Sequence, residues 1–157
     1  MNETIRTITE KDLPAVKAVL DSSELFPSEM LDDMIADFFN NKNSTDFWFT
    51  AIKDGTPISL GYCAPEQMTE GTFNLYAIAV DKQHQGTGIG SEMMGYIENH
   101  LRENDARILL VETSGTADFE LSRKFYQKIG YKQQAIIPKF YAKGDDKVVF
   151  WKKLIEK

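Results

Sequence analysis

The order of apolar and polar residues predicts a short strand and then a helix at the start of the chain. Thr4–Thr9 contains two isoleucines among polar residues, which indicates an opening strand. Thr9 lies three residues before Asp12, and Pro14 follows. This arrangement is typical of a capped helix start that tolerates proline in its first turn. We therefore expect a helix that runs to about Asp21.

Apolar pairs that recur every four residues predict a second helix. The pairs lie within residues 30–39, so one face of this helix is apolar, and Ser28 is placed to cap it. After residue 44 the period shortens, and Asp54-Gly55 is a hairpin turn sequence. The other expected elements are strands over Phe47–Lys53, Ile58–Ala64, Thr72–Val80, Arg107–Glu112, Tyr131–Ile137 and Lys147–Lys153, and helices over Gly88–Glu103 and Asp118–Ile129.

This order of elements predicts a mixed α/β (α+β) fold in one domain over residues 1–157. The first strands follow one another closely, which favours antiparallel pairing. The helix over 88–103 then joins two apolar strands as a β–α–β crossover. We expect a mostly antiparallel central sheet flanked by helices. The chain contains no repeat, low-complexity tract or flexible linker that would divide it.

Composition narrows the class of protein. Hydrophobic residues make up 42% and charged residues 27%, which is typical of a globular protein. The net charge is −6, which argues against a nucleic-acid partner and favours one that carries a cation or an amine. We expect no membrane span, no secretory leader and no metal site, because Cys63, His84 and His100 are not spaced as ligands. These features fit a cytoplasmic enzyme, and Cys63 reads as a small packed side chain.

A glycine-rich segment between a strand and a helix carries the sharpest chemical pattern. Gly86, Gly88 and Gly90 alternate with Thr87 and Ile89 just where the helix begins. Glycines let backbone N–H groups approach an anion closely, and the helix N-terminus adds its dipole. The segment predicts a cradle for a pyrophosphate, although a tight turn without a ligand has the same pattern.

Two other phosphate-binding classes can be compared with this segment. It lacks the lysine followed by serine or threonine of a P-loop. It matches the glycine pattern of a dinucleotide site, with Glu112 near the place of a ribose-binding acid. Against that alternative, the glycines begin several residues after the strand, and only 45 residues follow Glu112, which are too few for a doubly wound sheet.

The block from Tyr76 to Tyr131 resembles the GNAT superfamily of acyl-CoA N-acyltransferases. The family has a Gln/Arg-x-x-Gly-x-Gly/Ala motif after its central strand, present here over residues 85–90. It also has an aromatic–Tyr pair near the end of the next helix, followed by glycine and an aromatic residue, present here over residues 125–131. The order of elements agrees with the family's fold over nearly the whole chain.

This resemblance implies that acetyl-CoA is the acyl donor. The pantetheine arm would pair like an extra strand with Ile78, Ala79 and Val80, and the Val80 N–H would face the thioester oxygen as an oxyanion donor. The amine would attack the thioester directly, through a tetrahedral intermediate. The backbone amides that would bind the pyrophosphate are those of Gln85, Gly86, Thr87, Gly88, Ile89, Gly90 and Ser91.

The resemblance also implies two catalytic residues. Tyr126 would give a proton to the departing thiolate, to which a phenol is well matched in acidity. Glu112 is our first candidate for the base that deprotonates the amine, although an ion-paired strand end is an equal interpretation. Glu66, Glu70 or a water relay are the alternatives, because the position where other members carry a base is Asn74 here. A second departure is Phe119, where many members have asparagine.

The remaining alternatives concern the partner and the reaction. The amine acceptor would be a small molecule or a peptide, in a pocket framed by the first two helices and the last hairpin. A homodimer follows from the resemblance alone. A non-catalytic acyl-CoA-binding sensor or assembly module of the same fold is the main rival function, and a dinucleotide-binding oxidoreductase is the weaker one.

Overall fold

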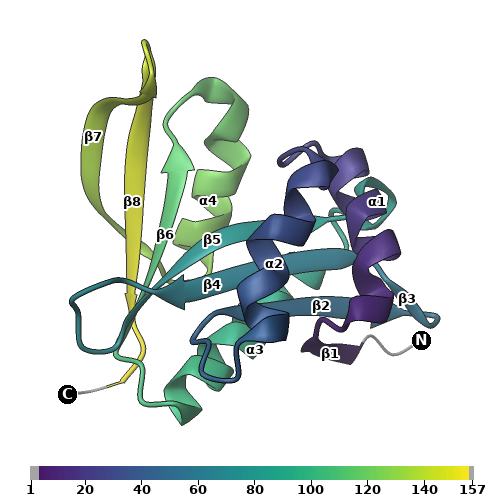
Figure 1. Cartoon of the computed structure of the whole chain (residues 1–157). Coiled ribbons are helices and arrows are strands. Elements are labelled where there is room, and N and C mark those ends of the chain that lie inside the picture. The colour runs from purple at the N-terminus through teal and green to yellow at the C-terminus, as the bar shows by residue number, and fades with distance from the viewer. Residues whose placement is uncertain (1–3, 156–157) are drawn as a thin grey trace. The chain divides into compact units, whose positions relative to one another are not determined.

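Eight strands form one mixed sheet in the computed structural model, which describes residues 4–155 (Figure 1). Hydrogen-bonded neighbours follow the order β1-β2-β4-β5-β6-β8-β7, and β3 pairs with β2. β5 and β6 are parallel and joined through α3, which confirms the predicted β–α–β crossover. The pairs β1–β2, β2–β4, β6–β8 and β7–β8 are antiparallel. The strands are β1 (Thr4–Thr7), β2 (Phe47–Lys53), β3 (Thr56–Pro57), β4 (Ser59–Pro65), β5 (Thr72–Val80), β6 (Ile108–Ser114), β7 (Lys132–Ala142) and β8 (Asp145–Lys153).

Four α-helices and four short 3₁₀ turns connect these strands in the described part of the chain. The helices are α1 (Leu13–Ser23), α2 (Leu31–Asn40), α3 (Ile89–Glu103) and α4 (Glu120–Lys128). The 3₁₀ turns are η1 (Glu10–Asp12), η2 (Ser28–Met30), η3 (Lys82–His84) and η4 (Ala117–Phe119). Residue contacts divide the chain into two compact units, one with residues 4–64 and 76–99 and the other with residues 65–75 and 100–155.

The capping box predicted before the first helix is present but opens the 3₁₀ turn η1, after which α1 begins at Leu13, and the predicted cap of the second helix is corrected. The Thr9 N–H donates to the Asp12 carboxylate over 2.7 Å, and Pro14 lies in the first turn of α1. Ser28 does not cap α2. It opens η2 instead, because the Met30 N–H donates back to the carbonyl of Pro27 over 3.0 Å and tightens the chain into a 3₁₀ turn first.

In the first unit, α1 and α2 cover one face of β2 and β4 (Figure 1). Trp48 and Leu60 point to these helices and are fully buried with Leu20, Leu31 and other apolar residues. The next residues along β2 point the other way: Phe47 and Phe49 stack near Tyr96 of α3, at 6.2 and 5.7 Å between ring centroids. The strict alternation of strand side chains therefore builds two apolar layers from one strand.

In the second unit, β6, β8 and β7 form an antiparallel ladder that α4 covers on one face. Phe150 of β8 is fully buried and lies opposite Val111 of β6. Both last strands are longer than predicted, and the turn between them is reduced to residues 143–144. The end of β7 was predicted wrongly because its register with β8 shifts between Gln133 and Ala135 and again between Ile137 and Ala142. These shifts break the regular alternation of side chains along the strand.

Candidate active site

The glycine segment is an open loop between β5 and α3. Gly86 and Gly88 have φ angles of +77° and +91°, a backbone conformation that L side chains rarely adopt. A Cβ atom built on either residue would meet no atom within 4 Å, so side chains here are excluded by backbone strain rather than by crowding. Both residues are exposed. The loop therefore presents bare backbone to the surroundings.

The first turn of α3 supplies unpaired donors next to this loop. The first hydrogen bond of the helix runs from the Glu92 N–H to the carbonyl of Gly88 over 3.1 Å. The N–H groups from Gly88 to Ser91 precede it and have no partner within the helix. They lie at the positive end of the helix dipole. Bare backbone and free N–H groups together are what an anionic pyrophosphate requires.

A carboxylate network fixes the start of this loop. Asp81 follows β5, and its carboxylate accepts hydrogen bonds from Ser22 Oγ at 3.0 Å, Gln83 N–H at 3.2 Å and His84 Nδ1 at 3.1 Å. Burial alone would raise the pKa of Asp81, but these hydrogen bonds outweigh burial and the pKa is lowered. The ionised carboxylate thus ties α1, η3 and the strand end together.

Two side chains of the motif turn back to the protein. Gln85 Nε2 donates to the carbonyl of Val80 over 3.0 Å, and Thr87 Oγ1 donates to the carbonyl of His84 over 2.6 Å. These contacts shape the loop without occupying its exposed amides. The Asp81 N–H donates to the carbonyl of Ile58 over 2.8 Å, which holds the end of β5 from the β4 side. A hydrogen bond just after Val80 therefore holds residues 78–80, the segment that the sequence analysis expects to pair with the arm of acetyl-CoA.

Tyr126 lies in the second unit, on the buried face of α4. Its ring packs near Phe125, Tyr131 and Phe150, with centroids 5.3, 5.8 and 5.9 Å away. Only 5% of the residue is exposed, and burial raises the pKa of its hydroxyl above the ordinary range. None of the described residues hydrogen-bonds this hydroxyl, and it is not among the fully buried polar atoms that lack a partner. The hydroxyl is therefore protonated at neutral pH.

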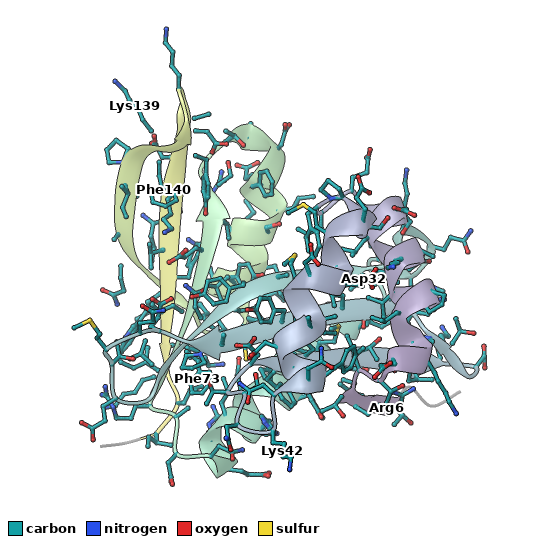
Figure 2. All side chains as sticks on the ribbon, viewed as in Figure 1. Arg6, Asp32, Lys42, Phe73, Lys139 and Phe140 are labelled. Carbon is teal, nitrogen blue, oxygen red and sulfur yellow. The ribbon has the colours of Figure 1, made fainter. Side chains whose placement is uncertain are left out.

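Glu112 is ion-paired within the second unit. Its Oε1 lies 2.9 Å from Lys147 Nζ, and the same ammonium lies 3.8 Å from the centroid of the Phe140 ring. Figure 2 shows Phe140 beside Lys139 in the upper part of the β7/β8 hairpin. Sequence reasoning missed Lys147, because 34 residues separate it from Glu112 along the chain. This ion pair gives Glu112 a structural role, which the sequence analysis left open as an alternative to the catalytic role.

Glu112 and Tyr126 lie on opposite faces of the β6–β8 pair. Tyr126 packs against Phe150, which is opposite Val111 in the ladder. Glu112 follows Val111, so its side chain points to the other face. An acid and a base at these positions would act from opposite sides of the sheet.

The alternative base candidates lie in the connection before β5. Glu66 Oε1 accepts a hydrogen bond from the amide of Asn74 over 3.0 Å, so a carboxylate adjoins the position where the sequence has asparagine. The carbonyl of Glu70 accepts from Arg107 Nε over 2.6 Å. Asn74 is 1% exposed, and its Oδ1 is one of two buried polar side-chain atoms without a partner in the described chain, with Trp48 Nε1.

Two other residues that the sequence analysis singled out are Cys63 and Phe119. Cys63 is fully buried in β4, and burial raises the pKa of its thiol, which keeps it unreactive. Phe119 is 44% exposed at the start of α4. The loop before that helix is held by Arg123, which donates to the carbonyls of Ser114 and Thr116 at 2.8 Å.

A metal site or a membrane span would each leave a recognisable feature in the described residues. No group of three or more His, Cys, Asp or Glu side chains is arranged to hold a metal ion there. None of the described helices is long and apolar enough to cross a membrane.

Comparison with known proteins gives concordant matches. The model of the acetyltransferase (GNAT) family matches residues 4–131. An uncharacterised N-acetyltransferase of Methanocaldococcus jannaschii is 28% identical over 152 residues, which cover 95% of this chain and 90% of that protein.

Solved structures share the fold. A protein of Desulfovibrio desulfuricans, described as an acetyltransferase of the GNAT family, has a TM-score of 0.91 at 24% identity, with 98% of this chain and 100% of that chain covered. An aminoglycoside 6′-N-acetyltransferase complexed with coenzyme A has a TM-score of 0.80 at 14% identity, with 98% of both chains covered.

Proposed function

Because the chain belongs to the GNAT acetyltransferase family, we propose that it moves the acetyl group of acetyl-CoA to a primary amine by direct attack in a ternary complex. Membership confirms the resemblance that the motifs indicated and makes the chain an acyltransferase. It favours the enzyme over both the non-catalytic module and the dinucleotide-binding oxidoreductase. The observation that carries the finer proposal is the open glycine loop at the N-terminus of α3.

The loop fits the pyrophosphate of acetyl-CoA. Backbone amides over residues 85–91 would bind the phosphate oxygens, and no side chain at Gly86 or Gly88 would stand in the way. The aminoglycoside acetyltransferase of the same fold was solved with coenzyme A, which supports this choice of donor. The arm of the donor would then run along Ile78, Ala79 and Val80.

The transfer itself needs few groups. The neutral amine nitrogen attacks the thioester carbonyl carbon, a C–N bond forms, and the C–S bond breaks. The Val80 N–H would stabilise the negative charge that develops on the carbonyl oxygen. The electron pair of the C–S bond leaves with the sulfur, which takes a proton. The attacking nitrogen loses a proton to a base, so charge and atoms balance.

Tyr126 is the proposed proton donor to the sulfur. Burial raises the pKa of its hydroxyl, so the phenol holds its proton at neutral pH, which is the form that a general acid requires. None of the described residues forms a hydrogen bond with this hydroxyl. The Tyr126 hydroxyl therefore meets the chemical requirement of a general acid.

Glu112 remains the first proposed base, with Glu66, Glu70 and a water relay as alternatives, although Glu112 lies on the face of the β6–β8 pair opposite to Tyr126. A base must accept a proton on a carboxylate oxygen, and Glu112 Oε1 lies 2.9 Å from the Lys147 ammonium. The same ammonium competes for the oxygen that would do so. Glu66 would need the Asn74 amide to hold its carboxylate in place.

The broader expectations from the sequence stay predictions beside this proposal. They are a cytoplasmic enzyme, a small-molecule or peptide amine as acceptor, no nucleic-acid partner and a homodimer. A single domain over residues 1–157 also stays a prediction.

Titration calorimetry and a thiol-release assay test the proposal. We expect micromolar binding of acetyl-CoA and none of NADH, and thiol release that depends on an added amine. Tyr126→Phe should keep acetyl-CoA binding and lower kcat about 10²- to 10⁴-fold. Tyr131→Phe, which removes a hydroxyl from the adjoining ring, is the matched control. Folded protein that fails to bind acetyl-CoA, or a Tyr126→Phe variant with full kcat, would contradict it.

A further inference from the structure

A row of three aromatic rings crosses the first unit from its core to its surface. Trp48 of β2 stacks on Tyr62 of β4, with centroids 4.0 Å apart and planes 8° from parallel. Tyr62 in turn lies 5.6 Å from Tyr76 of β5. Trp48 is fully buried, whereas Tyr76 is 50% exposed, although β5 lies in the middle of the strand order. The row therefore ends in a ring that is half exposed.

A carboxylate without a cationic partner adjoins this row. Asp46 directly precedes β2, and continuing the alternation of the strand by one residue would place it on the same side as Trp48. Since Trp48 pairs with Tyr62, Asp46 in that position would be a diagonal neighbour of Tyr62, about 7–8 Å away at the backbone. Asp46 makes no ion pair with any described residue. It therefore leaves an unbalanced negative charge beside the aromatic row.

The surroundings make this charge unfavourable. Burial raises the pKa of Asp46, and the nearby Asp37 carboxylate raises it further. The pKa of Tyr62 is raised by burial first and then by the Asp46 charge. Asp37 is occupied by hydrogen bonds from Ser44 and Asn41, which leaves Asp46 as the carboxylate available to a ligand.

A bound cation would relieve both features at once. An ammonium group is attracted to the face of an aromatic ring and pairs with a carboxylate. The amine that is acylated cannot be this cation, because it must be neutral when it attacks. We propose that Tyr62, Tyr76 and Asp46 bind a second, protonated ammonium group of the acceptor, so that the enzyme acylates diamines in preference to monoamines.

The place of Tyr76 along β5 fits this role, and this step rests on the proposed function. Tyr76 lies two residues before Ile78, about 7 Å along the strand, and on the same face. Ile78 begins the segment to which we assign the arm of acetyl-CoA. An acceptor whose charged end lies on Tyr76 would therefore extend its free amine along the strand toward the thioester.

A matched pair of acceptors tests the proposal. Butane-1,4-diamine and butan-1-amine have the same carbon chain and differ in the second ammonium group. We expect kcat/KM for the diamine to exceed that for the monoamine at least about tenfold, which corresponds to one favourable charged contact. Asp46→Asn should remove most of this preference through a higher KM for the diamine, with kcat for both amines kept.

Further variants separate charge from packing. Asp33→Asn removes an exposed carboxylate from α2 and should leave the preference intact. Tyr76→Phe keeps the ring face and should keep the preference, whereas Tyr76→Leu should lower it. Calorimetry of butane-1,4-diamine on the wild type and on Asp46→Asn measures the same site without turnover.

The outcomes distinguish this proposal from the proposed function. Turnover of both amines at equal kcat/KM, unchanged by Asp46→Asn, would overturn the diamine site and leave the acyltransferase activity standing. Diamine binding that is lost in Asp46→Asn, together with no turnover of any amine, would support the site and contradict the activity. A preference that Asp33→Asn reduces as much as Asp46→Asn would overturn the site, since net charge alone would then explain it.

Discussion

Replacing Gly88 by alanine separates the role of the glycine loop in binding from its role in folding. The substitution adds one methyl group at a residue with a φ angle of +91°. The added Cβ meets no protein atom within 4 Å, so the variant suffers no steric clash within the protein. The change acts on the backbone conformation and on the space that we assign to the pyrophosphate.

The two effects have different magnitudes. A left-handed backbone costs alanine about 1–2 kcal/mol, and the smaller conformational entropy of unfolded alanine offsets about 0.4–1 kcal/mol of this. A net loss of about 1 kcal/mol lowers Tm by roughly 2–4 °C in a chain of this size. In the complex, the methyl group would displace a phosphate oxygen from at least one charge-assisted hydrogen bond worth about 1.5–3 kcal/mol. The Kd for acetyl-CoA should therefore rise about 10- to 150-fold.

Thermal melts and calorimetric titration with acetyl-CoA measure the two effects on the same protein. Gly144→Ala is the matched control, because Gly144 has a φ angle of +80° and equally open space at the turn between β7 and β8. It should show the same loss of Tm with an unchanged Kd. Gly95→Ala, in the open interior of α3, should instead raise stability by about 0.5–1 kcal/mol. If Gly88→Ala weakens binding no more than Gly144→Ala, the glycine serves the turn alone and our reasoning is refuted.

Three further predictions concern stability. Hydrogen bonds from Arg6 lower the pKa of Asp12 from 3.8 to about 2, so this carboxylate stabilises the fold by up to about 2 kcal/mol above pH 4. The urea unfolding energies of the wild type and Asp12→Asn should converge as the pH falls from about 4 to about 2, and a constant gap would contradict this. A Cβ on Gly61 would overlap the ring of Phe49, so Gly61→Ala should cost about 1–3 kcal/mol in urea unfolding, and Phe49→Leu should recover part of it. If the chain is one domain, circular dichroism and tryptophan fluorescence should report one thermal transition with a common midpoint, and two separate midpoints would refute it.

Strands with clear boundaries were predictable from local sequence. The bounds of β2 and β5 match the prediction, because apolar runs end at turn residues on both sides. The hairpin turn between β2 and β3 is likewise confirmed, with Asp54 and Gly55 at φ angles of +52° and +79°. The β7/β8 hairpin was predicted too short, since every residue of β7 is exposed and no apolar alternation marks its extent.

The chemistry of Glu112 could not be read from local sequence. An ion pair depends on which side chains a ladder brings together, and register places Glu112 opposite Val149, two residues from Lys147. The same holds for Asn74 and Glu66, which meet across the connection before β5. The sequence could identify these residues as candidates, but their partners follow from strand pairing alone.

The two substrates of the proposed reaction differ in how their sites are encoded. The donor loop is one continuous segment from Val80 to Ser91, and its requirements are backbone conformations that glycine alone meets easily. Such a site leaves a readable motif. The proposed acceptor site combines Asp46, Tyr62 and Tyr76, which lie on or next to three different strands. Each of these residues alone fits an ordinary packed or exposed position. The specificity for the acceptor can therefore change through single substitutions on separate strands while the donor motif and the fold persist.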